Sequence, residues 1–255
     1  MKHRILFSNV GYAKGIDGSL TQHVMRFGRH FYCPVPVQQQ VLGQLKAIIH
    51  DQKPDICCFV EVDSGSFTSS YFNHLQYMTD EAYPFSDIAD KYGEKSRLGR
   101  LPLFSGKSNG FLARENYAFD RIYFAHGAKR LMYRLRVSED TTIFFGHFSL
   151  KYRIRQKQLE EMNSYVRATK GNVIVLADFN ILNGLAELTP LLNETNLRIM
   201  NDESKHTFRF YNRQHVLDVC LCSEGLLPHA QLHIIPQPFS DHAALLLDLD
   251  AGRGV

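Results

Sequence analysis

Apolar residues gather along the chain in short, almost uninterrupted runs that have the length of β-strands. A run such as "VIVLA", without polar alternation, is typical of a strand covered on both faces. The runs lie at 4–10, 55–62, 130–137, 141–150, 172–180, 216–222, 231–235 and 243–250. The residues "SED" between the third and fourth runs predict a hairpin turn.

Segments with helical periodicity lie between several of these runs. In the segment 37–55, apolar residues recur on one helical face, and Pro54 marks its end. The segment 153–171 repeats this pattern and ends in a glycine that suits a C-cap, and the shorter segment 67–78 is expected to be helical as well. Alternating strands and helices predict a layered α/β fold, and the number of strands favours two sheets packed together.

Composition and charge narrow the class of protein. The chain has 255 residues without a linker or repeat, so we expect one domain, 1–255. Its net charge of +3 is compatible with a phosphate-bearing partner but is low for a protein that coats DNA. The N-terminal apolar run is too short for a signal peptide, and no run is long enough to span a membrane. The cysteines lie mainly in apolar runs without metal-binding spacing, which predicts reduced core thiols and a cytoplasmic location.

Polar or titratable residues stand at the ends of, or inside, six of the apolar runs. They are Asn9, Glu61, His147, Asp178 with Asn180, Asp218, and Asp241 with His242. Each residue alone has an ordinary explanation, such as a solvated strand end, an Asx turn or a helix cap. Functional groups of α/β sheets collect beyond the carboxyl ends of strands, so the whole set predicts an active site.

The residues of this set support a specific chemistry, that of a metal ion, an oriented water and a bound phosphate. Hard oxygen ligands such as Asn9, Glu61 and Asp241 suit Mg²⁺ or Mn²⁺ rather than zinc. Asp178 and Asn180 are two residues apart, so on an extended chain they would point to the same side and could orient a water molecule. The remaining Asp–His pair could hold a positive charge near a phosphate.

The ordered set resembles the endonuclease/exonuclease/phosphatase superfamily, which includes DNase I-like and exonuclease III-like enzymes. The similarity covers nearly the whole chain, and it lies in the Asn after the first strand, the Glu after "DICCFV", "GHFSL", the Arg-x-x-Gln at Arg155 and Gln158, "ADFN", "LDVCL" and "SDH". The resemblance implies a four-layer α/β sandwich, in which two mixed sheets pack face to face with helices outside. It also implies a metal-dependent phosphoric ester hydrolase with its site at one edge of the sheets.

The resemblance also implies the role of each matching residue. Glu61 would bind the metal, Mg²⁺ or Mn²⁺, with Asn9 and Asp241 as further ligands or neighbours. Asp178 would orient and deprotonate the attacking water, and Asn180 would hold that water or a phosphoryl oxygen.

The other matching residues would act on the phosphate. His147 would bond to a non-bridging oxygen, and His242, paired with Asp218, would stabilise the charge of the transition state. Asn109 in "SNGFLAR" resembles an asparagine that contacts the phosphate in the family, although Ser108 replaces a glycine there.

The substrate is less well defined by the sequence. The stretch 91–109 has no period and is rich in basic residues, including Lys95, Arg97, Arg100 and Lys107, so we expect a long loop that grips phosphates. This favours nucleic acid, DNA or RNA, or a nucleotide-like substrate. A small-molecule or lipid-headgroup phosphoester is the alternative, because the net charge is modest and the basic stretch has few aromatic residues on which bases could stack. No obligate protein partner is evident, and endo versus exo action is left open.

Overall fold

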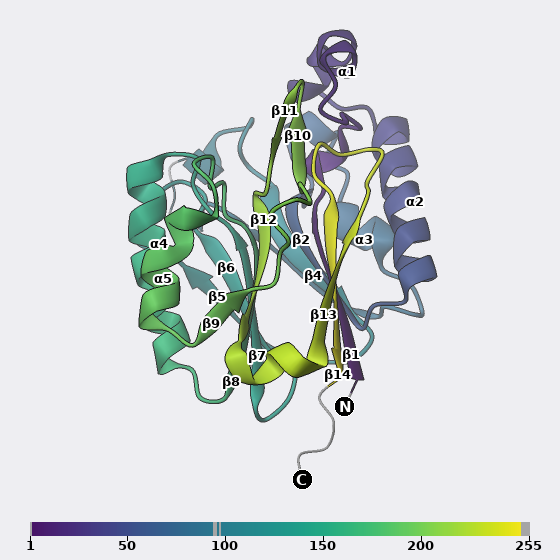
Figure 1. Ribbon diagram of the computed structural model, residues 1–255. Helices are drawn as coiled ribbons and strands as arrows, with labels where there is room; N and C mark the ends of the chain where they lie inside the picture. The colour runs from purple at the N-terminus through teal and green to yellow at the C-terminus, as the bar shows by residue number, and fades with distance from the viewer. Residues whose placement is uncertain (1, 94–95, 97, 251–255) are drawn as a thin grey trace.

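Two six-stranded mixed β-sheets pack face to face in the computed structural model, which describes residues 2–93, 96 and 98–250 (Figure 1). Across the first sheet the order is β13 (Ala230–Ile235), β14 (Ala244–Asp250), β1 (Lys2–Asn9), β2 (Ile56–Asp63), β4 (Lys107–Ala113) and β3 (Phe85–Asp90). Across the second it is β5 (Ala118–Tyr123), β6 (Leu131–Arg136), β7 (Thr141–His147), β8 (Asn172–Asp178), β12 (Asp218–Ser223) and β9 (Leu197–Ile199). A separate hairpin is formed by β10 (Phe208–Phe210) and β11 (Arg213–His215).

Helices cover the outer face of each sheet, which confirms the predicted four-layer α/β sandwich. The helix α2 (Val35–Gln52) and the short α3 (His74–Met78) lie on the first sheet, and α4 (Tyr152–Ala168) and α5 (Thr189–Glu194) lie on the second (Figure 1). The remaining helical segments are α1 (Leu20–Met25) and the 3₁₀ turns η1 (Gly11–Ala13), η2 (Phe27–His30), η3 (Phe67–Ser69), η4 (Leu98–Arg100), η5 (Leu185–Leu188) and η6 (Glu224–His229).

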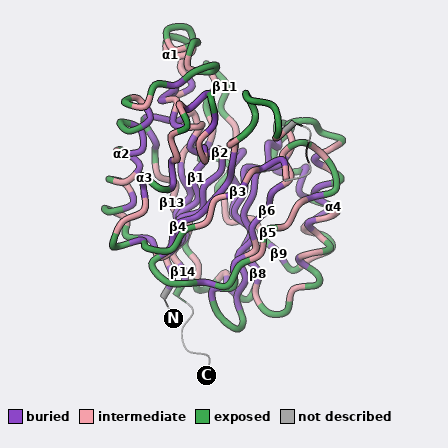
Figure 2. Tube along the Cα trace, turned by 180° about the vertical axis from the view of Figure 1, so that it is seen from behind, coloured by how far each residue is buried: buried purple, intermediate pink, exposed green. Residues whose placement is uncertain are grey.

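Because the apolar runs are uninterrupted, a strand formed by such a run presents apolar side chains on both of its faces. In β1, Ile5 and Phe7 point into the core between the sheets, whereas Leu6 packs in the core beneath α2. In β2, Cys58 likewise points into the core between the sheets, and Cys57 packs in the core beneath α2. The described core strands are therefore almost fully buried, as the purple trace at the centre of Figure 2 shows, and this burial is the main driving force for the layered arrangement.

Strand direction brings the polar ends of the runs to one edge. The strands β1 and β2 are parallel, as are β7 and β8, so these four end together. The strands β12 and β14 run the opposite way beside β8 and β1, so they begin at that edge. Both chain ends of the described fold lie toward the other end of the molecule (Figure 1).

Two predicted elements differ from the structure. The segment 67–78 is not one helix, because Ser70 and Tyr71 adopt left-handed backbone conformations and Asn73 caps the separate helix α3. The stretch 91–109 is not a loop throughout, because Lys107 begins strand β4. Its first four residues, "KSNG", are polar or small, so the strand lacks an apolar signal there although Ser108 and Asn109 are buried.

All five cysteines are buried and free, as the apolar runs predicted. Among the described residues, no helix combines the length and the hydropathy that a membrane span requires.

The helix α4 is joined to the loop after β7 by buried polar side chains. Arg155 is 1% exposed, bonds to the Glu187 carboxylate at 2.6 Å through Nη2, and donates to the carbonyl oxygens of Ser149 and Leu150. Gln158 donates to the Lys129 carbonyl at 2.7 Å and accepts from the Ser149 amide at 2.9 Å. The Arg-x-x-Gln pair therefore fixes the backbone of the loop after β7 and of the segment that leads into β6.

We predict that Arg155→Met destabilises the protein by about 3–5 kcal/mol, because it leaves the buried Glu187 carboxylate without its cation. Urea denaturation measures this as a lower midpoint. The control Arg153→Met changes an exposed arginine of the same helix and should stay within about 0.5 kcal/mol of the wild type. Equal stability of the two variants would contradict a stabilising role for the Arg155–Glu187 pair.

Candidate active site

A chain of close polar contacts joins side chains of both sheets at their shared edge, which we call the catalytic edge. His147 and Asp178 are register partners on β7 and β8, and His147 Nε2 lies 3.1 Å from Asp178 Oδ2. Asn9, at the end of β1 in the other sheet, donates from Nδ2 to the same Oδ2 at 3.0 Å. Asn9 Nδ2 also lies 3.4 Å from His242 Nε2. The sequence-predicted residues Asn9, His147, Asp178 and His242 are thus in direct contact.

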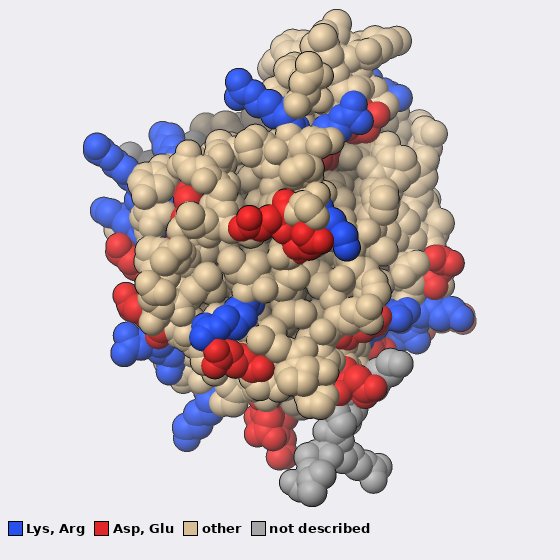
Figure 3. All heavy atoms as spheres, in the orientation of Figure 1, with Lys and Arg blue, Asp and Glu red and all other residues tan. Residues whose placement is uncertain are grey.

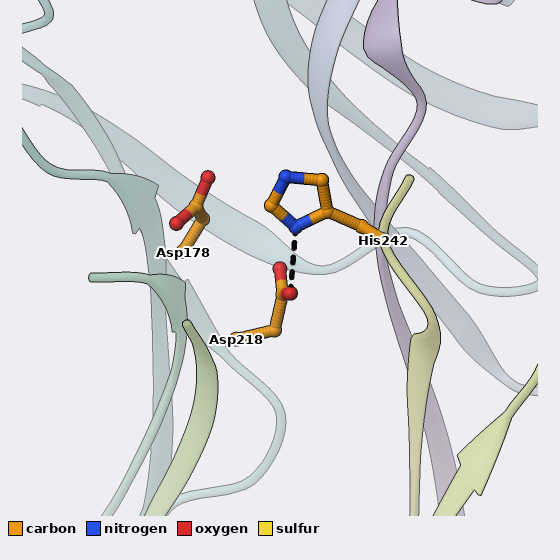
Figure 4. Close-up of side chains that lie close together, drawn as sticks. All are labelled: Asp178, Asp218 and His242. Atoms are coloured by element: carbon orange, nitrogen blue, oxygen red, sulfur yellow. Dashed lines mark hydrogen bonds and ion pairs between the residues drawn. The ribbon is translucent and has the colours of Figure 1, made fainter. Parts of the chain in front are cut away.

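His242 forms a buried pair with Asp218. Its Nδ1 lies 2.7 Å from Asp218 Oδ2, the contact drawn as a dashed line in Figure 4. Burial alone would lower the pKa of His242, but the Asp218 carboxylate, with help from Asp178 and Asp241, raises it to about 10. The imidazole is therefore a cation at neutral pH, held with Nε2 toward Asn9.

The Asp178 carboxylate is buried, and neighbouring charges and hydrogen bonds act on it from several sides. Burial, together with the charge of Asp218, raises its pKa to about 7 against the opposing charges of His242 and Lys129. Its Oδ1 accepts the Asn180 backbone amide at 3.1 Å. A group with a pKa near neutrality is suited to accept a proton under physiological conditions.

Asn180 lies beside Asp178 for a different reason from the one the sequence suggested. The chain is not extended there, because Asn180 has a left-handed φ of 53°. Its Nδ2 donates to the Phe148 carbonyl at 2.9 Å, next to His147. The prediction that Asp178 and Asn180 point to the same side of an extended chain was therefore wrong, although the Asn180 side chain does lie at the catalytic edge.

Glu61 occupies an irregular position in β2. Its φ is 55°, and the pairing of β2 with β4 shifts register between Phe59 and Val62. This bulge directs Glu61 to the edge, with Oε1 3.7 Å from His147 Nδ1 and 3.6 Å from Lys129 Nζ. Burial would raise the pKa of Glu61, but the cationic charges around it, led by Lys129, hold that pKa well below its usual range.

Two sets of groups are suited to a divalent cation. Burial raises the pKa of Asp241, and the negative charge of Glu61 contributes to this rise, so these two carboxylates are close enough to repel. A cation between them would relieve that repulsion, and oxygen ligands are what Mg²⁺ and Mn²⁺ prefer.

The second set consists of Asp178, Asp218 and His242 (Figure 4). One possible ligand atom from each lies within 4.8 Å of the other two, and all three residues are buried. This group could hold a metal ion, although the ion would take the place of the direct Asp218–His242 bond.

Three lysines near Glu61 were not predicted as site residues. Lys129 contacts both Glu61 and His147, and burial followed by the Lys129 charge keeps the pKa of His147 well below its usual range. Lys91 is buried against the Tyr12 hydroxyl, and burial lowers its pKa to about 7. Lys14 also acts on Glu61 by its charge. No local pattern marks these lysines, because only the fold brings them to one carboxylate.

The residues predicted to bind the substrate lie in different surroundings in the structure. Asn109 is buried behind the edge, where its Nδ2 bonds to the Leu131 carbonyl at 3.2 Å and its Oδ1 has no partner. Lys107 lies in β4, not in a free loop, and pairs with the buried Asp63 at 2.8 Å, so its charge is already neutralised. Arg100 is exposed. Lys95 and Arg97 lie outside the described residues.

A cavity of about 350 Å³ opens beside the Asp218–His242 pair. Asp241 and His242 line it on one side and the hairpin β10–β11 on the other. The exposed Arg209 of this hairpin also lines the cavity, so it places a further positive charge there that the sequence analysis did not single out. The volume is within the range of small-ligand sites.

The comparison with family models gives one match over most of the chain. The model described as the Endonuclease/Exonuclease/phosphatase family matches residues 39–242. No curated protein sequence is significantly similar to the chain.

Solved structures share the fold at low sequence identity. Truncated TDP2 of Caenorhabditis elegans superposes with a TM-score of 0.63 at 14% identity, covering 98% of each chain. Sphingomyelinase C of Streptomyces griseocarneus gives 0.64 at 13% identity, over 98% of this chain and 99% of that one. The endonuclease domain of TRAS1, a telomere-specific non-LTR retrotransposon, gives 0.60 at 13% identity, over 98% of this chain and 100% of that one. At this identity the likeness establishes the fold alone.

We predict that the His242 imidazole of the metal-free protein titrates near pH 10, since its pKa is raised by Asp218. Asp218→Asn removes the negative charge that favours the imidazolium, so the midpoint should fall toward the ordinary histidine value. NMR of the His242 ring measures both midpoints. An unchanged His242 midpoint in Asp218→Asn would mean that the carboxylate does not hold the charge.

Proposed function

The chain belongs to the endonuclease/exonuclease/phosphatase family of metal-dependent phosphoesterases, and we propose that it hydrolyses phosphodiesters with Mg²⁺ or Mn²⁺. The observation that carries the proposal is the contact chain at the shared edge. It links a carboxylate with a pKa of about 7, Asp178, through Asn9 to His242, an imidazole whose pKa of about 10 makes it a cation at neutral pH. A base and a cation placed side by side suit attack of water on a negatively charged phosphate.

In this proposal the protein groups divide the work. Asp178 accepts the proton of the attacking water, while Asn180 and Asn9 fix the orientation of that carboxylate and its surroundings. The water oxygen bonds to phosphorus as the bond to the leaving oxygen breaks. His242, held by Asp218, offsets the negative charge that develops on the phosphoryl oxygens or protonates the leaving oxygen. At the same edge, the Lys129 ammonium adds a positive charge, and the His147 imidazole in contact with it adds a further polar group.

The proposed metal position lies at Glu61 with Asp241 and Asn9. A divalent cation bound there would polarise a phosphoryl oxygen and stabilise the developing charge. Glu61 presents Oε1 at the edge, and its negative charge acts on Asp241, whose pKa is raised mainly by burial, so the two carboxylates together would offer charged oxygen ligands. The Asp178–Asp218–His242 group is the competing position.

The substrate can be narrowed only by the surroundings of this site. Nucleic acid or a nucleotide-like molecule was the sequence prediction, and it stays a candidate through the exposed Arg100 and Arg209 and through the endonuclease name of one similar structure. The pairing of Lys107 with Asp63 removes one of the four basic residues on which that prediction relied.

A lipid-headgroup phosphodiester is the second candidate. Exposed apolar side chains cluster near the β10–β11 hairpin that borders the cavity, which favours a substrate with an apolar part. One similar structure is a sphingomyelinase by name.

The five buried, free thiols support a cytoplasmic location, which we propose as well.

A substrate panel tests the activity. We predict metal-dependent product release, abolished by EDTA, from at least one member of a panel of single- and double-stranded DNA, RNA, an activated small phosphodiester, phosphoinositides and sphingomyelin. Asp178→Asn should lower kcat by roughly 10²-fold or more with little change in KM, because it removes a base needed only in the transition state. Turnover that persists in EDTA, or in Asp178→Asn, would contradict the mechanism.

Metal binding distinguishes the two cation positions. If the ion binds at Glu61, Glu61→Gln should weaken Mn²⁺ binding by roughly tenfold or more, because it removes a charged ligand without changing size. Asp218→Asn should then change Mn²⁺ affinity little. Isothermal titration calorimetry without substrate gives both values. The reverse pattern would place the ion at Asp178, Asp218 and His242 instead.

A further inference from the structure

An apolar knob protrudes beside the catalytic edge. We define the knob as residues 20–31, formed by α1, η2 and the residues that join and follow them. Its tip exposes Leu20 (58%), Val24 (68%), Met25 (80%), Phe27 (61%) and Phe31 (59%). Exposed apolar side chains are common one at a time, but five within twelve consecutive residues form a patch of the kind that marks an interaction surface.

The base of the knob is positively charged. The segment 15–33 contains Arg26 and Arg29 and a single acid, Asp17, which lies outside the knob and accepts from the Gln22 amide at 2.8 Å. Arg26 donates to Gln22 Oε1 and Arg29 to the Lys14 carbonyl, so both use neutral acceptors and keep their charge. Figure 3 shows the result: an uncharged tip at the top of the molecule, with Lys and Arg side chains below it.

The knob has a fixed relation to the active site. The Tyr211 amide of the β10–β11 hairpin donates to the Gly18 carbonyl at 2.8 Å, and the Arg209 amide donates to the Asp241 carbonyl at 2.9 Å. Gly18 has no room for a side chain, since a Cβ there would lie 2.0 Å from the Arg209 carbonyl oxygen. His23 also packs edge-on against Phe210 and Tyr211. The knob, the hairpin and the catalytic edge therefore form one continuous surface.

We propose that the knob is a docking element for a lipid bilayer that carries anionic headgroups. Its apolar tip enters the boundary between headgroups and acyl chains, and its basic base pairs with the anionic headgroups. This docking turns the catalytic edge toward the membrane surface. The proposal goes beyond the phosphodiesterase function and does not require it, because binding involves no residue of the catalytic edge.

Charge and side-chain type favour a bilayer over a nucleic acid. Proteins that bind single strands interleave basic residues with aromatic rings on which bases stack. Here the two most exposed side chains, Met25 and Val24, are aliphatic and offer no stacking face, and the charges lie below the tip rather than among it.

Vesicle co-sedimentation of the full chain tests the proposal without turnover. The wild type should sediment with vesicles of phosphatidylcholine and phosphatidylserine, less with phosphatidylcholine alone, and less at high salt. The variant Val24→Ser/Met25→Ser/Phe27→Ser should lose roughly tenfold or more in partitioning, because it removes three inserting side chains. Its circular dichroism should match the wild type, since these positions are exposed.

The matched control is Phe85→Ser, an exposed phenylalanine at the start of β3, paired with Ala113 at the opposite end of the sheet. It should sediment like the wild type. Asp178→Asn, which removes the proposed base, should also sediment normally, so a failure of docking and a failure of the proposed function are told apart.

Three results would overturn the proposal. The first is a wild type that stays in solution with anionic vesicles. The second is equal sedimentation of the triple variant. The third is that the wild type does not bind vesicles, but binds a single-stranded oligonucleotide or forms a concentration-dependent dimer, and that the triple substitution abolishes this binding. The surface would then be assigned to nucleic acid or to a second copy of the chain.

Discussion

The burial of one carboxylate, that of Asp178, governs the arrangement of the catalytic edge. A buried carboxylate is costly unless hydrogen-bond donors surround it, and here they come from Asn9 in the first sheet and from the Asn180 backbone amide, while His147 on the neighbouring strand lies in close contact. Because Asn9 belongs to the other sheet, the bond to Asp178 ties the two sheets together at the edge. The same surroundings leave the pKa of Asp178 near 7, so the interaction that closes the edge also poises the group for proton transfer.

The sequence predicted the frame of the fold and most of the candidate site. Strands buried on both faces are recognisable because neither face needs polar residues, as in β8 and β14. Polar residues beside such runs are conspicuous, so Asn9, His147, Asp178, Asp218 and His242 could be selected, and the structure brings them together.

What could not be predicted depends on backbone irregularity or on contacts distant in sequence. Asn180 and Glu61 reach the edge through left-handed residues that no periodicity reveals. Lys129 and Lys91 are ordinary basic residues until the fold brings them to Glu61. Lys107 was assigned to a loop because the buried start of β4 is polar, and its partner Asp63 lies 44 residues earlier in the chain. The sequence analysis made no prediction for the knob, because the exposure of its apolar side chains depends on how the rest of the chain packs.

The position of β14 has a consequence for how the enzyme matures. This last described strand lies between β13 and β1, and Arg4 near the start of the chain bonds to Asp248 across 244 residues. The first sheet is therefore divided into two parts until residues 244–250 have been synthesised, and long-range pairing of this kind is slow. His242 and Asp241 immediately precede β14, so the charged half of the catalytic edge arrives with the strand that completes the sheet. In a nascent chain that lacks this strand, Asp178 can be in place while His242 is not yet held beside it, so the proposed active site is complete only once β14 has paired.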